Sequence, residues 1–291
     1  MKIKLFDPHV GIDEQQAIKR TLMSKFWASG QGSGNVSKFE KKFKRFINSD
    51  TCVAVNSGTA ALNLAVSLIP IKGKEVILPS LSFVSTANSV LINGGIPKFV
   101  EVEPDTLCID PISIKNSITK KTKLILPVHF GGFPCKLDEI KKIADKNGCH
   151  IIEDAAHAVG SKFSTQKIGK HSFAACFSFH PVKNLAMPTG GLISINHPDH
   201  KKFEKKLKSL RWCGISNRKL TSYDVTELGN NYYMNEFSAA IGLVQLKKIN
   251  RLTKMRQKIA KKYFNEIDIE NKMPFDRRCS YHLYWVCINF F

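Results

Sequence analysis

The sequence predicts an α/β protein whose large domain has three layers, α/β/α. Short β-branched runs alternate with helix-like stretches from about residue 51 to residue 196. These runs are TCVAVN, EVILP, IPKFVEV, KLILPVHF, HIIED, AACFSF and GLISIN. Most are continuously apolar, which is typical of strands that are buried on both faces of a sheet. We therefore expect one central sheet with helices on both sides.

Helical patterns connect and flank the predicted strands. Those between strands are TAALNLAVSL, VSTANSVLINGG and CKLDEIKKIADKNG, and those outside span residues 13–24, 36–47, 199–212 and 234–267. We expect residues 1–245 to form the large domain and residues 246–291 to comprise a linking helix and the start of a smaller α+β domain. The tail CSYHLYWVCINFF is β-like, and an apolar strand needs a partner sheet. We therefore expect the chain to end inside an incomplete small domain.

Length and composition indicate a globular protein. The chain has 291 residues, of which 43% are hydrophobic, enough for a sizeable core. No stretch approaches the roughly 20 apolar residues that a membrane span requires. The N-terminal MKIKLFDPHVGIDEQ lacks the apolar core and cleavage site of a signal peptide. We therefore expect a cytoplasmic protein without a membrane partner.

The formal net charge of +20 raises the question of nucleic-acid binding. However, the excess is mostly lysine on amphipathic segments such as KKFKRF and KKFEKKLKSLRW, without a basic tail or a nucleic-acid motif. A solvated lysine-rich surface is the better interpretation, and we expect no specific nucleic-acid partner. The eight cysteines have no metal-ligand spacing, so we expect reduced thiols and no metal site.

Three stretches combine a strand end with polar residues. In VNSGTAAL, the backbone N–H groups of a helix start and the hydroxyls of Ser57 and Thr59 suit a phosphate, although an ordinary N-cap explains the pattern equally. In IIEDAAHAVGS, Asp154 suits a cationic ring nitrogen, or it caps the next turn. His157 either contacts a ligand or satisfies a loop.

The third stretch, CFSFHPVKNLAMPTGG, places Lys183 between two apolar runs. A partly desolvated lysine is a nucleophile toward aldehydes, whereas a surface position is the commoner fate of a lysine. The order of the three stretches favours the ligand interpretation. Pyridoxal 5'-phosphate (PLP) needs an anion site, a carboxylate against its ring nitrogen and a lysine amine.

Five ordered blocks closely resemble the DegT/DnrJ/StrS family of sugar aminotransferases. They are SGTAAL, LPSLSFVSTANSVLINGGIPKFVEVEPDT, IIEDAAHAVGS, FSFHPVKNLAMPTGG and NYYMNEFSAAIGLVQLKKI. The resemblance implies the aspartate-aminotransferase fold, fold type I of PLP enzymes, and a homodimer with active sites at the subunit interface. It also implies amino transfer, usually from glutamate, to a keto-sugar on a nucleotide diphosphate. The expected pathways produce cell-surface polysaccharide or a glycosylated metabolite.

The resemblance also implies residue roles. Lys183 would bond covalently to PLP and move the proton, and Asp154 would keep the ring nitrogen protonated. The phosphate would be held by residues of the SGTAAL turn and the following strand end, namely Ser57, Gly58, Thr59, Ala60 and Ser178. Phe83 would stack on one side of the ring and His157 would lie on the other. Asn231 would reach the cofactor phosphate of the neighbouring subunit.

Departures from the family pattern concern the substrate more than the cofactor. Pro188 and Thr189 replace a glycine and an acid, and Tyr233 and Asn235 replace an arginine and a serine. Two other functions stay open. PLP-dependent sugar dehydratases of the same fold replace the lysine with histidine, so Lys183 argues against that branch. A non-catalytic regulatory paralogue would not need to keep Lys183, Asp154 and Ser178 together.

Overall fold

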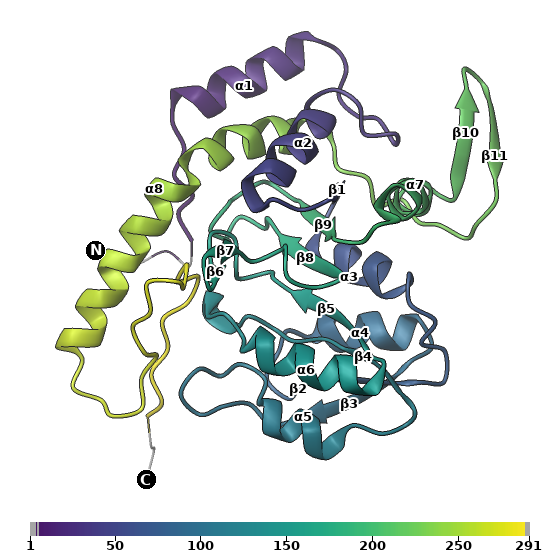
Figure 1. The fold of residues 1–291 in the computed structure, drawn as a ribbon. Coiled ribbons are helices and arrows are strands. Elements are labelled where there is room, and N and C mark those ends of the chain that lie inside the picture. Colours follow the sequence, from purple (N-terminus) through teal and green to yellow (C-terminus); the bar gives the residue numbers. More distant parts are fainter. Residues whose placement is uncertain (1–3, 5, 289–291) are drawn as a thin grey trace.

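A seven-stranded sheet forms the centre of the molecule (Figure 1). The structure, a computed structural model, describes residue 4 and residues 6–288. The strand order is β1-β9-β8-β5-β4-β2-β3. The bounds are Thr51–Val55 for β1, Glu75–Pro79 for β2, Ile96–Val100 for β3, Thr122–Ile125 for β4, His150–Asp154 for β5, Ala174–Ser178 for β8 and Gly191–Ile195 for β9. Each of the seven predicted strands is therefore confirmed.

The strand directions bring many strand ends to one edge of the sheet. In the described sheet, β2, β3, β4, β5 and β8 pair in parallel, and β9 pairs antiparallel with both β1 and β8. The carboxyl ends of six strands therefore meet at the same edge, where the amino end of β9 joins them. Ligands of α/β proteins bind at this edge.

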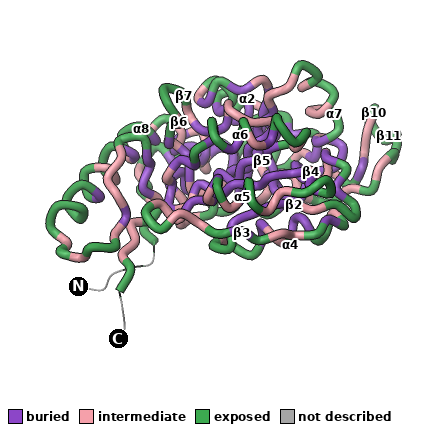
Figure 2. Tube along the Cα trace, turned by 60° about the horizontal axis from the view of Figure 1, so that its bottom comes forward, coloured by how far each residue is buried: buried purple, intermediate pink, exposed green. Residues whose placement is uncertain are grey.

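The sheet is buried on both faces, as its apolar strands predict (Figure 2). In β1, Cys52 and Ala54 pack into one core cluster, whereas Val53 and Val55 pack into the other. Successive side chains of a strand point to opposite faces, so two separate layers are needed to cover them. The three-layer α/β/α prediction is confirmed.

Helices from different parts of the chain cover the two faces. One face packs against α2 (Asn35–Ile47), α5 (Pro111–Ser117), α6 (Leu137–Asn147) and the long α8 (Glu236–Glu266). The other packs against α3 (Gly58–Val66), α4 (Val84–Ile92) and α7 (His200–Leu210). The N-terminal α1 (Ile12–Met23) lies on α8, where Ala17 contacts Ala240 and Val244. Among the helices of the described chain, none is both long enough and apolar enough to span a bilayer.

Smaller elements lie outside the sequence prediction. Helix α5 begins with Pro111, and the Asp110 side chain accepts hydrogen bonds from the N–H groups of Ile112 and Ser113. This Asp-Pro pair is a helix start signal that could have revealed it. Two hairpins, β6 (Lys162–Phe163) with β7 (Gln166–Lys167) and β10 (Ile215–Lys219) with β11 (Ser222–Val225), and a 3-10 turn, η1 (Phe130–Gly132), complete the elements.

The prediction of a strand in the C-terminal tail is wrong for the described residues. Residues 268–288 contain only an isolated bridge between Lys272 and Val286. They run beside α8 instead (Figure 1), where Met273, Cys279 and Tyr281 form a small core with Ala260. A strand needs a continuous neighbour for its backbone, and this segment buries its apolar side chains against a helix. The division into two domains stays a prediction.

A buried arginine connects the glycine-rich loop before α2 to the sheet. Arg211 has no exposed surface, and its Nη1 lies 2.7 Å from Glu40 Oε1 and donates to Ala54 O at 2.8 Å. Its Nη2 donates to Gln31 O at 2.7 Å. Glu40 also accepts a hydrogen bond from the Ala54 N–H group. One side chain thus holds α2, β1 and the loop together.

We predict that Arg211→Met destabilises the protein by about 3–5 kcal/mol, because Glu40 keeps its buried charge without a cationic partner. The free energy of unfolding from urea titrations is the measurement. Arg45→Met, at an exposed position of α2, is the control and should change it by less than about 1 kcal/mol. An equal effect of both variants would show that the buried pair contributes nothing.

Candidate active site

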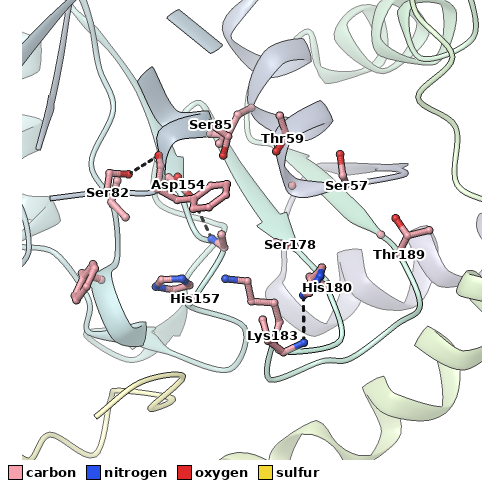
Figure 3. A pocket seen from close by; sticks show the side chains of 18 residues that line it. Ser57, Thr59, Ser82, Ser85, Asp154, His157, Ser178, His180, Lys183 and Thr189 are labelled. Carbon is pink, nitrogen blue, oxygen red and sulfur yellow. Dashed lines mark hydrogen bonds between the residues drawn. The ribbon is translucent and has the colours of Figure 1, made fainter. Parts of the chain in front are cut away.

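A cavity of about 430 Å³ lies at the edge of the sheet where the strand ends meet (Figure 3). Its walls come from the segments that follow β1, β2, β4, β5 and β8, and from the turn before β9. Eight of the predicted site residues line it, namely Ser57, Gly58, Thr59, Phe83, Asp154, His157, Ser178 and Lys183. Ala60 and Asn231 are not among the lining residues. The fold therefore brings together residues that are up to 126 positions apart, from Ser57 to Lys183.

The turn between β1 and α3 forms one end of the cavity. Ser57 is the N-cap of α3, and its Oγ accepts a hydrogen bond from the Ala60 N–H group at 3.1 Å. A Cβ atom at Gly58 would lie 2.7 Å from the Ser178 Cβ atom, so this turn approaches the end of β8 too closely for a side chain. A helix start with free N–H groups and nearby hydroxyls is an anion site. The Ala60 N–H group is already used by the cap.

Asp154 ends β5 and lies at the back of the cavity, with 4% of its surface exposed. Its Oδ2 accepts a hydrogen bond from Thr86 Oγ1 at 2.8 Å, and its Oδ1 accepts one from the Ala156 N–H group at 3.1 Å. Burial raises the pKa of the Asp154 carboxyl, while these two hydrogen bonds and the charge of Lys183 oppose that rise. A cationic partner in the cavity would stabilise the carboxylate.

Lys183 lies in the loop between β8 and β9 and is partly buried. The loop turns tightly, because the Lys183 N–H group donates to His180 O at 2.8 Å. Burial lowers the pKa of the Lys183 amine, and the charge of Asp154 opposes the effect. A lowered pKa increases the fraction of free amine, the form that attacks an aldehyde.

Two histidines flank the Lys183 amine. Burial lowers the pKa of His157 to about 3, and its Nδ1 accepts a hydrogen bond from the Gly131 N–H group at 3.3 Å. The ring of His282 lies 4.4 Å from that of His157, centroid to centroid, and its Nε2 is 3.5 Å from Lys183 Nζ. Burial lowers the pKa of His282 to about 2. Both rings are therefore neutral near pH 7.

Sequence reasoning missed several residues of this site. Ser82 Oγ lies 2.6 Å from Thr86 Oγ1, which in turn bonds to Asp154. The i, i+4 spacing of these hydroxyls at the start of α4 was the available signal. His282 was hidden because its segment, SYHLYW, was interpreted only as a strand. His180 and Thr189 also line the cavity.

Asn231 does not line the cavity of its own chain, although it contacts the neighbour of the lining residue Ser57. It is exposed after β11, and its carbonyl accepts a hydrogen bond from the Asn56 side chain at 3.3 Å. The hairpin of β10 and β11 just before it projects from the body of the molecule (Figure 1). The predicted role toward a neighbouring subunit stays a prediction.

A model of the DegT/DnrJ/EryC1/StrS aminotransferase family matches residues 8–290. The chain belongs to this family. It is 37% identical to the spore coat polysaccharide biosynthesis protein SpsC of Bacillus subtilis, over 95% of this chain and 73% of that protein. The resemblance inferred from the five sequence blocks is thereby confirmed.

Solved structures agree with the family assignment. Helicobacter pylori PseC, an aminotransferase involved in the biosynthesis of pseudoaminic acid, superposes with a TM-score of 0.90 at 26% identity, over 98% of this chain and 77% of that chain. NtdA of Bacillus subtilis, with bound cofactor PMP, the amino form of PLP, has a TM-score of 0.84 at 29% identity, over 94% and 63%. The protein is a PLP-dependent sugar aminotransferase.

The cavity fits this cofactor. The closely packed turn at Gly58 and Ser178 offers an anion site, Asp154 offers a buried carboxylate and Lys183 offers an amine. These three groups face one space (Figure 3). They match the phosphate, the ring nitrogen and the aldehyde of PLP.

We predict that Asp154→Asn makes the cofactor-free protein more stable at pH 7.5. A carboxyl whose pKa is raised in the folded state lowers stability as the pH rises above its unfolded value near 4. The gain in Tm should therefore be present at pH 7.5 and shrink toward pH 4. The exposed Asp105→Asn is the control, with no such gain. A lower Tm for Asp154→Asn at pH 7.5 would contradict the argument.

Proposed function

We propose that the protein transfers an amino group from glutamate to a keto-sugar attached to a nucleotide diphosphate. The product would be used for cell-surface polysaccharide or a glycosylated metabolite. SpsC, whose name assigns it to spore coat polysaccharide, and PseC, which serves pseudoaminic acid synthesis, support this class of product. The net charge of +20 favours an anionic substrate of this kind.

One observation supports the proposal most directly: Lys183 and Asp154 line the same cavity and influence each other's pKa. Aminotransfer needs a base that moves a proton at the reacting carbon and a fixed negative charge at the far side of the cofactor ring. A lysine replaced by histidine would serve the dehydratase chemistry of related enzymes, so the intact Lys183 favours aminotransfer.

The residues of the site act as follows in this proposal. When bound, PLP supplies an aldehyde that bonds to amines and a ring that takes up the electron pair left by a departing proton. Lys183 Nζ takes that proton from one carbon and returns it to the neighbouring carbon. Asp154, held by Thr86, provides the negative charge that keeps the ring nitrogen protonated. Phe83 and His157, which both line the cavity, would hold the ring.

The turn before α3 orients the ligand in this arrangement. The N–H groups at the start of α3 and the hydroxyls of Ser57, Thr59 and Ser178 would hold the phosphate at one end of the cavity, and Asp154 would hold the ring nitrogen at the other. If both ends of the cofactor are held in this way, its reacting carbon atoms lie beside Lys183. Such positioning converts the proton transfer into an intramolecular step.

The visible absorbance spectrum tests this function. Purified protein with PLP should show the band of the lysine-bound cofactor, and glutamate should convert it to the spectrum of the amino form. Lys183→Ala should remain folded but show neither the band nor transamination, because Lys183 is the one lysine among the described residues that line the cavity. Full transamination by Lys183→Ala would refute the assignment.

We also propose a homodimer in which Asn231 completes the partner's site. Leu220 and Leu228 beside this segment are 92% and 98% exposed, and the mouth of the cavity leaves Phe83 70% exposed. Large apolar side chains at such exposure are suited to contact with a second subunit. A shared site makes the dimer necessary for activity.

Hybrid dimers test this arrangement. Lys183→Ala and Asn231→Ala are each expected to be inactive alone, because each site needs one residue from each subunit. After unfolding and refolding together in equal amounts, they should regain about a quarter of the wild-type activity, since half the dimers then have one intact site. Mixtures of each variant with itself are the controls. If mixing restores no activity while light scattering shows dimers, Asn231 does not act across the interface.

A further inference from the structure

A second cavity, of about 640 Å³, adjoins the cofactor cavity at the Lys183 loop. Val182 and Lys183 line both cavities. The other walls come from residues near the N-terminus, from α8 and from the C-terminal segment, which run close to one another (Figure 1). The two cavities therefore meet at Val182 and Lys183, and His282, which also lines the second cavity, lies 3.5 Å from Lys183 Nζ through its Nε2.

The second cavity is lined mainly by basic and apolar side chains. The nitrogen-containing basic residues around it are Lys4, His9, Lys183, Arg256 and His282. Among the described lining residues, the sole carboxylate is Asp7, which is exposed and lies 3.4 Å from Lys4 Nζ. Apolar side chains of Leu252, Met255, Ile259 and Leu283 complete the wall. The cavity is thus suited to an anionic molecule with an apolar portion.

Arg256 is the cation whose charge is least balanced in this cavity. It is partly buried on α8, and its Nη1 donates to Tyr281 O at 3.3 Å. Within residues 6–288 and Lys4, no carboxylate lies within ion-pair distance of it. Burial lowers the pKa of its guanidinium, and among the described residues no acidic group opposes this effect. A partly desolvated guanidinium is usually paired with an anion.

The contrast with Arg211 strengthens this point. Arg211 is fully buried in the fold and its charge is matched by Glu40 at 2.7 Å. Arg256 is only partly buried, but it faces a cavity, and no carboxylate of the described residues pairs with it. Its carbonyl contact through Nη1 leaves Nη2 available for an oxyanion, and the planar guanidinium binds carboxylate and phosphate oxygens well.

The neighbours of Arg256 place the anion close to the chemistry. His282 lies within the field of both Arg256 and Lys183, which together with burial keep its ring neutral. Its Nε2 is 3.5 Å from Lys183 Nζ. Because the His282 ring is neutral, it does not repel the charges of Arg256 and Lys183, and it does not compete with them for an anion.

We propose that Arg256 binds an oxyanion of the substrate, a carboxylate or a phosphate, in this second cavity, and so holds the reacting carbon beside Lys183. This inference rests on the proposed function, since glutamate and a nucleotide-linked sugar each contain such an oxyanion. Lys183 moves the proton for both substrates in alternation, so one cavity serves them in turn.

Arg256→Gln is the test variant, because glutamine keeps an N–H donor for Tyr281 O and removes the charge. Lys254→Gln, at an exposed position on the same helix that lines neither cavity, is the matched control. Arg256→Lys keeps the positive charge but cannot form the bidentate hydrogen bonds of a guanidinium. The absorbance band of the lysine-bound cofactor must be equal in all variants, which shows that the fold and the cofactor site are intact.

Two readouts separate the possible anions. The first is the glutamate concentration that gives half the maximal rate of band conversion. The second is the Kd of uridine diphosphate, used as the probe, from calorimetry of the PLP-loaded protein. Loss of a charged hydrogen bond weakens binding about tenfold to a hundredfold. We expect Arg256→Gln to show such a loss in at least one readout, Arg256→Lys a smaller loss, and Lys254→Gln none.

The outcomes are distinct. A loss confined to glutamate assigns a carboxylate to Arg256, and a loss confined to uridine diphosphate assigns a phosphate. Wild-type protein that does not react with glutamate would overturn the proposed donor, while the diphosphate measurement would still test Arg256. Equal values for Arg256→Gln and Lys254→Gln in both readouts, or wild-type protein that binds neither molecule, would overturn the inference.

Discussion

The burial of two opposite charges in one cavity is the constraint on which the rest of the structure depends. Asp154 and Lys183 are both withdrawn from water, so burial raises the pKa of the acid and lowers the pKa of the base. Burying these two groups destabilises the cofactor-free protein. A cofactor with a cationic ring nitrogen would pair with Asp154, and its aldehyde would react with the Lys183 amine, so it would offset both desolvation penalties. The surrounding fold holds Asp154 and Lys183 in position when no cofactor is bound.

The sheet provides the necessary rigidity. Asp154 ends a central strand and is held by Thr86 from α4 and by the Ala156 N–H group. At the other end of the cavity, Gly58 and the end of β8 approach within a distance that no side chain would permit. The cofactor cavity is therefore built on hydrogen-bonded and closely packed strand ends, which suits a site whose catalysis depends on fixed geometry.

The C-terminal segment joins this rigid edge to the second cavity. Ser280 Oγ lies 2.8 Å from Ser161 Oγ and donates to His157 O at 3.2 Å, and Ser280 O accepts a hydrogen bond from Asn184 at 3.1 Å. Asn184, which follows Lys183, is thus hydrogen-bonded to the segment that contains His282. A segment that sequence reasoning interpreted as a strand instead connects the Lys183 loop with Arg256 on α8.

The sequence by itself determined the strands, most helices, the fold class and eight of the residues that line the cofactor cavity. The strands follow from apolar runs long enough to be buried, and polar motifs such as SGTAAL and IIEDAAHAVGS at strand ends indicated a ligand site. Phe83 was added only by the resemblance to the family. Only the tertiary structure decided that Thr86 supports Asp154, that His282 contacts Lys183 and that no carboxylate of the described residues pairs with Arg256. Each of these facts depends on contacts between distant segments, and the spacing of residues along a chain does not specify which buried charges meet.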